Sequence, residues 1–306
     1  MIGEVILAKE HIYMEIDKIS WEIGVNFLKS ILLEVSSHPK PGLVTSKSNG
    51  SHKDMNILTF MVGSAEIAPA FFQCAQAGRN HVGELSQLLQ IIRNIGINLE
   101  KNLLEGTKGI NTQRGILFSA CIVCGAAGYL SKESELIKSE DVFNVVSEIT
   151  KDIVERELYG IDHNKGELTA GEQLFLKYGV KGIRGEVEAG FPAVKEAGLP
   201  AFYEAINKGV GLNLSLVHTL IALMTKVEDT TILWRKDWDT LIQVQRRAEE
   251  IIGLGSVFTK EGLEAIHQLD EALIGENISP GGSADLLSIT VGIYLLENKE
   301  FPIRIL

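Results

Sequence analysis

Apolar residues recur at helical spacing along almost the whole chain. In residues 21–35 they fall at steps of four, three, four and three, which gives one apolar stripe along a helix. Residues 142–153, 212–224 and 263–273 repeat this spacing. No convincing series of alternating apolar and polar residues indicates β-strands. The chain is therefore predicted to form helices from one end to the other.

These helices are expected to share one core. No Pro- or Ser-rich linker, block of like charge or internal repeat divides the 306 residues. The longest apolar run, residues 116–130, is shorter than the roughly 20 residues that span a bilayer, and we expect it to be the central helix of the core. Pro69 is expected to kink or break its helix. We predict an all-α fold, a single compact multi-helix domain over residues 1–306, whose polar, glycine-containing loops form the active site.

Charge and cysteine content exclude several kinds of protein. The net charge of −11 argues against binding to nucleic acid or to an anionic membrane, since both require a basic face. The first 18 residues carry charges throughout and lack the apolar core of a signal peptide, so we expect a cytoplasmic protein. Cys121 and Cys124 lie within the apolar run and are expected to be buried thiols rather than a redox pair. The sequence leaves open whether the chain forms a homo-oligomer.

Five polar segments interrupt or follow the helical pattern. Each combines carboxylates with hydroxyl, amide or basic side chains, and four of them contain glycine; they are residues 39–55, 105–115, 182–192, 226–235 and 278–287. A purely structural interpretation is available, in which Asp54 caps the helix that follows it and Ser283 and Asp285 cap the last helix. The functional interpretation is that residues 40–54, 111–114, 186–188, 229–231 and 281–285 converge on one cleft.

The chemistry of these segments suits a phosphate-bearing ligand. Carboxylates and hydroxyls are the oxygen ligands that Mg²⁺ binds together with substrate phosphates. The residues that we predict as Mg²⁺ ligands are Glu186, Glu188, Asp229, Thr230 and Asp285. Basic side chains in the same segments could neutralise phosphate oxygens. The chain has neither the G-x-x-x-x-G-K-[ST] phosphate loop nor a Rossmann fingerprint, so any phosphate would bind on a helical scaffold.

The same segments resemble those of the triphosphoribosyl-dephospho-CoA synthases, which serve citrate lyase and malonate decarboxylase. The likeness spans roughly residues 31–290 and lies in "PKPGLV" with "GSHKDM", "IRNIGINLEKNLLEGTKGINTQRG", "RGEVEAG" and "SPGGSADLL". The resemblance implies a pentosyltransferase with two substrates, ATP and 3′-dephospho-CoA. Such an enzyme cleaves the N-glycosidic bond of ATP, releases adenine and joins the triphosphoribosyl group to the 2′-hydroxyl of dephospho-CoA.

Displacement at C1′ with inversion needs negative charge near an oxocarbenium-like centre and a base for the incoming hydroxyl, as in glycosidases. Among the carboxylates of these regions, which include Glu34 and Glu100, we favour Asp54, Glu188 and Asp229 for catalysis. Lys40, Arg114 and Arg235 are predicted to hold the triphosphate. The full set predicted to bind substrate is Lys40, Asn49, His52, Asn111, Thr112, Arg114, Arg184, Arg235, Gly281, Gly282 and Ser283.

Two departures from the family pattern leave other functions open. Gln113 stands where the family usually has a histidine, and an amide cannot shuttle a proton as an imidazole does. The "EDTT" segment continues as "ILWRKD" rather than with a small, glycine-containing run. The alternatives are a Mg²⁺-dependent hydrolase of ribosyl bonds, similar to ADP-ribosylglycohydrolases, and a non-catalytic helical nucleotide-binding protein. Adenine release that requires dephospho-CoA would separate the three.

Overall fold

The computed structural model describes residues 16–134, 136–161 and 168–302. All regular structure in these ranges is helical, without a strand, so the predicted all-α class is confirmed. The α-helices α1 to α13 are Lys18–Ser36, Ile57–Asn80, Leu85–Gly106, Arg114–Leu130, Ser139–Ile149, Ala170–Tyr178, Gly182–Glu188, Leu199–Asn207, Leu212–Met224, Thr230–Arg235, Trp238–Gly253, Lys260–Gly275 and Gly281–Asn298. Three shorter helical turns, η1 to η3, are Glu155–Tyr159, Val194–Gly198 and Ser256–Phe258.

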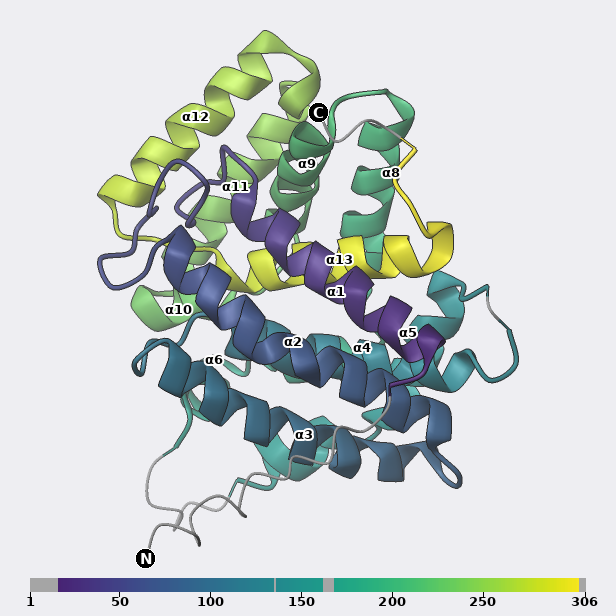
Figure 1. The fold of residues 1–306 in the computed structure, drawn as a ribbon. Coiled ribbons are helices and arrows are strands. Elements are labelled where there is room, and N and C mark those ends of the chain that lie inside the picture. The colour runs from purple at the N-terminus through teal and green to yellow at the C-terminus, as the bar shows by residue number, and fades with distance from the viewer. Residues whose placement is uncertain (1–15, 135, 162–167, 303–306) are drawn as a thin grey trace, which may run out of the picture.

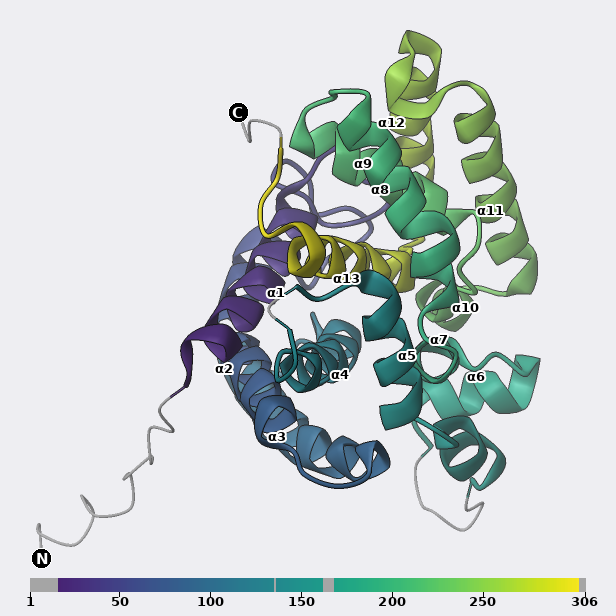
Figure 2. The same cartoon turned by 90° about the vertical axis from the view of Figure 1, so that its right-hand side faces the viewer.

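Helix α4 lies in the middle of the lower half of the molecule, as predicted for the longest apolar run. It is surrounded by α1, α2, α3, α5 and α13 (Figure 2). Small residues let it approach α2 closely: a Cβ atom added at Gly78 would lie 1.9 Å from the carbonyl oxygen of Gly125. The three cysteines are free and buried here, as expected. Burial raises the pKa of the Cys74 and Cys124 thiols, so they are poor nucleophiles.

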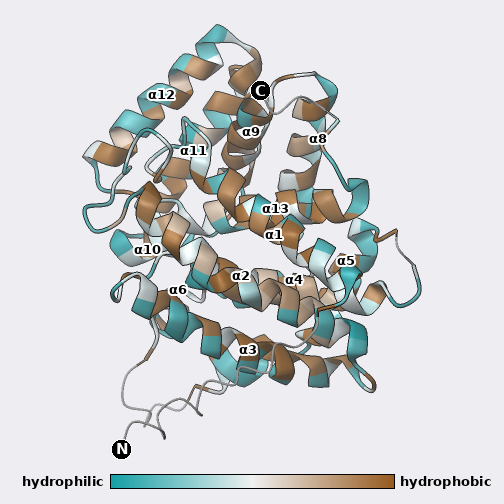
Figure 3. Ribbon diagram, in the orientation of Figure 1, coloured by the Kyte–Doolittle hydropathy of each residue, from teal (hydrophilic) through white to brown (hydrophobic). Residues whose placement is uncertain are grey.

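Two helices connect this lower half with the upper half. Helices α1 and α13 cross the middle of the view in Figure 1, with α2, α3 and α4 on one side and α8, α9, α11 and α12 on the other. Helix α13 is buried from Ser283 to Leu296 except at Asp285, and it contacts α1, α4, α9 and α10. Figure 3 shows its apolar character and that of α9. The N-terminus of α13 therefore brings its polar first turn to the centre of the molecule.

Helix α2 continues through Pro69, so the helix does not break there. By length and composition α2 is apolar enough to cross a membrane. The core helix of a globular protein has the same properties, and α2 packs against α1, α3 and α4. These neighbours keep the helix continuous although proline removes one backbone hydrogen bond.

The polar segments differ from expectation at three places. Residues 182–188 form helix α7 rather than a loop, although they contain two glycines. Asn56, not Asp54, caps α2: its Oδ1 accepts from the backbone N–H groups of Leu58 and Thr59. The first turn of α13 begins at Gly281 without a side-chain cap, so the expectation that Ser283 and Asp285 cap it is wrong. Residues 42–55 and 107–113 contain no helix, as predicted.

Candidate functional site

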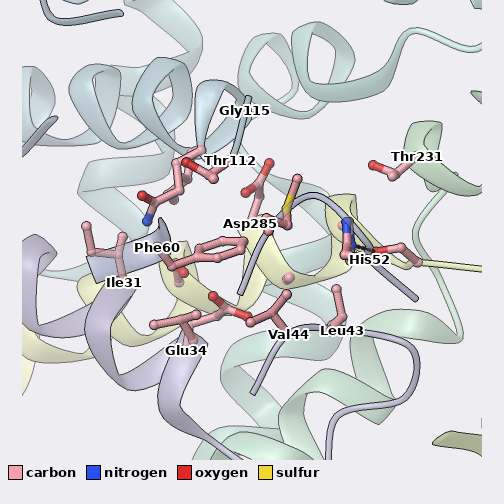
Figure 4. A pocket seen from close by; sticks show the side chains of 18 of the residues that line it. Ile31, Glu34, Leu43, Val44, His52, Phe60, Thr112, Gly115, Thr231 and Asp285 are labelled. Carbon is pink, nitrogen blue, oxygen red and sulfur yellow. Dashed lines mark hydrogen bonds between the residues drawn. The ribbon is translucent and has the colours of Figure 1, made fainter. Parts of the chain in front are cut away.

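A cavity of about 220 Å³ lies where four distant parts of the sequence meet. Its walls come from the end of α1, the segment 40–55, the residues that lead into α4, and the first turn of α13, with contributions from α10 (Figure 4). Eight of the residues predicted to act on substrate or metal line it: Lys40, His52, Asn111, Thr112, Arg114, Arg235, Gly281 and Asp285. We call this space the first cavity.

A buried ion pair, Lys40 with Glu34, lines one side of the first cavity. The Lys40 ammonium, 1% exposed, donates a hydrogen bond to Oε1 of Glu34 at the end of α1. Burial raises the pKa of Glu34 and lowers the pKa of Lys40, while the attraction between the two groups opposes both shifts. Because Lys40 is committed to Glu34, it is not a free cation for phosphate. Glu34, which was not among the residues predicted to act on substrate, thus adds a carboxylate to the lining of the first cavity.

Asp285 presents a carboxylate to the same cavity from the fifth position of α13, just after its first turn (Figure 4). Within the described part of the chain it has no hydrogen-bond or ion-pair partner. Burial, with Glu34 and Asp229 nearby, raises its pKa well above the usual range. The hydroxyl of Thr112, which lines the same cavity, is buried without a partner. Buried polar groups normally have partners, so this hydroxyl and the partly exposed carboxylate of Asp285 are available to a polar ligand.

His52 and Arg235 form a hydrogen-bonded pair in another wall of the cavity. Arg235 Nη2 donates to His52 Nδ1 at 3.1 Å, and His52 Nε2 lies 3.0 Å from Ser279 Oγ. Burial and the adjacent guanidinium lower the pKa of His52 to about 4, so the ring is neutral at pH 7. Asp54 lies at the exposed rim, 3.8 Å from this ring, and does not line the cavity.

Asp229 is buried beneath the cavity and joins two helices. Its Oδ1 accepts from the N–H groups of Thr231 and Ile232 as the N-cap of α10. Its Oδ2 accepts from the N–H of Ser283 at 2.8 Å and from the Ser283 hydroxyl at 3.0 Å. The adjacent Gly282 permits this approach, because a Cβ there would lie 3.2 Å from the Asp229 carboxyl carbon. With four donors on its two oxygens, Asp229 positions the first turn of α13.

Glu186 and Glu188 lie away from the first cavity. Glu186 accepts a hydrogen bond from the N–H of Ala193 at 3.2 Å. Glu188 accepts from the N–H of Val154 at 3.1 Å and lines a separate open cavity of about 410 Å³. The structure therefore does not bring the three carboxylates favoured for catalysis, Asp54, Glu188 and Asp229, around one space.

The five predicted Mg²⁺ ligands likewise do not meet. Asp285 lines the first cavity, Thr230 lines a second one, and Glu188 lines the third. Among the described residues, no group of three or more His, Cys, Asp or Glu side chains could hold a metal ion. These residues do not form a preformed protein site for Mg²⁺.

A second cavity, of about 630 Å³, lies on the other side of the segment that leads into α4. The two cavities share Asn111, Arg114 and Gly115. The second cavity contains the predicted Arg184 and also Arg93, which the sequence patterns did not single out because it lies within the regular α3 helix. Asn49 is exposed in the 40–55 segment and lines neither cavity.

Gln113 anchors the shared segment to α2. Its buried side-chain amide donates to the hydroxyl of Ser64 at 3.0 Å. A Cβ atom at Gly63 would lie 2.7 Å from Gln113 Oε1, so the segment lies directly on the helix. An amide does not titrate, so Gln113 cannot transfer a proton.

Comparison with known proteins identifies the family. A family model described as ATP:dephospho-CoA triphosphoribosyl transferase matches residues 20–302. A probable 2-(5″-triphosphoribosyl)-3′-dephosphocoenzyme-A synthase of Malonomonas rubra is 46% identical over 100% of this chain and 97% of its own length. A synthase of the same name from Pectobacterium atrosepticum is 38% identical over 89% of this chain and 88% of its own.

A longer relative, protein CitXG of Leuconostoc mesenteroides subsp. cremoris, is 35% identical over 86% of this chain and 56% of its own length. No solved structure matches the chain. The comparisons give no support to the ribosyl-hydrolase or non-catalytic alternatives. The chain belongs to the family of ATP:dephospho-CoA triphosphoribosyl transferases.

Proposed function

We propose that this protein transfers the 5-triphosphoribosyl group of ATP to the 2′-hydroxyl of 3′-dephospho-CoA and releases adenine. The family supports the reaction class. The observation that carries the assignment to this site is the pair of carboxylates in the first cavity, Glu34 with a cationic partner and Asp285 with none. Two carboxylates in different electrostatic settings are what acid–base chemistry at a glycosidic carbon requires.

The two carboxylates divide the proton transfers between them. Asp285 takes up a proton more readily than Glu34, because Lys40 stabilises only the charged form of Glu34. Protonated Asp285 donates to the leaving adenine as the bond from C1′ to nitrogen breaks. Ionised Glu34 accepts the proton of the 2′-hydroxyl as its oxygen bonds to C1′ from the opposite face. The proton gained by Glu34 balances the one lost by Asp285, and the triphosphate is carried over intact.

We further propose that Mg²⁺ enters with the phosphates of ATP. This proposal rests on the usual coordination of Mg²⁺, through one or two carboxylates plus substrate phosphates and water. It agrees with the separation of the predicted protein ligands. Bound in this way, the ion would balance the negative charge of the phosphates, while Asp285 and Glu34 carry the proposed proton transfers.

The product is proposed to be the precursor of the prosthetic group on an acyl-carrier subunit, of either citrate lyase or malonate decarboxylase. This follows from the roles that the family serves. We also propose that the reaction takes place in the cytoplasm, where ATP is available.

The dependence of adenine release on the acceptor tests the proposed reaction. With ATP and Mg²⁺, adenine release measured by liquid chromatography should be fast with 3′-dephospho-CoA and at least about tenfold slower with CoA. The 3′-phosphate of CoA crowds the attacking 2′-hydroxyl and adds charge beside an anionic donor. Equal rates of adenine release with dephospho-CoA, with CoA and without acceptor would contradict the proposal.

A further inference from the structure

Two arginines from different helices share one glutamate at the wall of the second cavity. Arg184 Nε, on α7, donates to Oε2 of Glu157 at 2.8 Å, and Arg93 Nη2, on α3, donates to Oε1 of the same carboxylate. The three side chains are between 21% and 30% exposed. Two guanidinium groups held by one carboxylate leave an excess positive charge. Glu157 therefore fixes the direction of both cations without neutralising them.

A third arginine lies where the two cavities meet. Arg114, the first residue of α4, pairs with Glu100 at 2.6 Å and remains 51% exposed. The start of α6 lines the same space, and Gly171 lies so near Arg184 that an added Cβ would be 3.2 Å from its Nη1. At this start the N–H of Glu172 is paired with Thr169 Oγ1 and the Glu172 carboxylate accepts from Thr169, so it is the helix dipole that favours an anion here. Cations and helix dipole thus act on the same cavity from three directions.

The volumes of the two cavities indicate that different parts of one nucleotide occupy them. The first cavity, at about 220 Å³, is smaller than the roughly 300–1,000 Å³ of sites that enclose a whole small ligand, whereas the second, at about 630 Å³, lies within that range. If C1′ of the donor is near Asp285, its 5′ chain can leave the first cavity past Asn111 and Arg114. That route leads to Arg93 and Arg184.

We propose that the second cavity binds the triphosphate chain of ATP through Arg93, Arg114 and Arg184, with Glu157 as the positioning residue for two of them. This inference rests on the proposed function, since it takes the donor from that reaction. It replaces Lys40, whose charge Glu34 neutralises, and Arg235, which lines only the smaller first cavity, as triphosphate ligands. Planar guanidinium groups suit the task, as they bind phosphate oxygens in pairs.

The test separates binding from catalysis. Inorganic tripolyphosphate should bind the wild-type protein in isothermal titration calorimetry, and more tightly than pyrophosphate. R93M and R184M should each weaken that binding by about tenfold or more. R184K keeps the charge but not the planar guanidinium group, and its affinity for tripolyphosphate should lie between those of wild type and R184M. An intermediate affinity would show that the loss in R184M is not caused by misfolding. R247M is the matched control, because Arg247 pairs with Glu276 outside both cavities.

Kinetics distinguish the two polyphosphate sources. The KM for ATP should rise in R93M and R184M while the KM for dephospho-CoA stays within about twofold. A selective rise in the KM for dephospho-CoA would assign the cavity to the acceptor's diphosphate and overturn the proposal, as would unchanged tripolyphosphate binding in folded R93M and R184M. Arginine-dependent tripolyphosphate binding by a protein that releases no adenine would leave this site standing and contradict the proposed reaction instead.

Discussion

The carboxylate of Asp285 lies against the backbone of Gly115: its Oδ2 is 2.0 Å from the position that a Cβ atom would occupy there. Gly115 is the second residue of α4, and Asp285 is the fifth residue of α13, just after its first turn. Both residues line the first cavity. The absence of a side chain at position 115 is thus a condition for Asp285 to reach the proposed reaction centre.

Gly115→Ala should therefore impair catalysis more than folding. The added methyl group displaces the Asp285 carboxylate, and misplacement of a reacting group by about 1 Å commonly costs about 10² in rate. Adenine release and the melting temperature measure the two effects. Gly253→Ala is the control, because a Cβ at the end of α11 meets no atom within 4 Å. Full activity of the Gly115 variant would show that Asp285 need not occupy its present place.

Asp285→Asn should remove the proposed acid while keeping the shape of the side chain. An amide cannot donate its proton to adenine, and we expect kcat to fall by about 10²–10³ with little change in the KM for ATP. Asp239→Asn, at an exposed position in the first turn of α11, is a control that should retain full activity. If both variants release adenine at the wild-type rate, Asp285 is not the acid.

The sequence predicted the fold well because helical periodicity reports directly on burial. Residues 212–224 coincide with α9, and the apolar run 116–130 with all but the first two residues of α4. The helix α7 was not predicted, since Gly182 and Gly185 are weak helix formers. A Cβ atom at Gly182 would lie 2.9 Å from the methyl carbon of Thr230, so the start of α7 lies close to α10, a proximity that no local pattern contains.

Asp229→Asn should mainly destabilise the protein. The asparagine oxygen can replace only one of the two carboxylate oxygens, so its NH₂ group would face N–H or O–H donors from α10 or α13. Leaving such a buried donor unpaired costs about 1–3 kcal/mol. Urea denaturation at pH 7 measures the loss, with Asp141→Asn, an exposed change in the first turn of α5, as the neutral control. A stability equal to that of the control variant would refute this structural role.

Glu186→Gln should stabilise the protein in a pH-dependent way. Burial, with the charges of Glu196 and Glu228, raises the pKa of Glu186 from 4.5 to about 7. The folded state therefore binds more protons than the unfolded state between these values, and stability falls as pH rises through that window. Glutamine carries no charge and can still accept from the N–H of Ala193. The variant should match wild type near pH 4.5 and exceed it by about 1–3 kcal/mol at pH 8.

Thermal or urea unfolding across this pH range tests the prediction for Glu186. Adenine release should be unchanged, since Glu186 lines none of the three cavities. A loss of activity that excess Mg²⁺ restores would instead support the metal-ligand role predicted from the sequence.

The site was only partly predictable, because the role of each residue depends on contacts with distant parts of the chain. Glycine, carboxylate and basic residues marked the segments that converge, and eight of the predicted residues line the first cavity. Sequence could not show that Lys40 is neutralised by Glu34, or that Asp229 is saturated by backbone donors, because both depend on burial and on partners from other helices. Arg93 lies in a segment that resembles the family but was not predicted to bind substrate, because it is paired with a partner, Glu157, that is 64 residues away.

The ratio of the two products tests the central claim most directly. Wild-type protein is incubated with ATP, Mg²⁺ and 3′-dephospho-CoA, and adenine and ribosylated species are quantified by mass spectrometry in one mixture. The account predicts one triphosphoribosyl-dephospho-CoA for each adenine, with neither ADP nor pyrophosphate rising in step. Adenine accompanied by free ribose triphosphate, at the same rate with or without dephospho-CoA, would contradict it and identify a hydrolase.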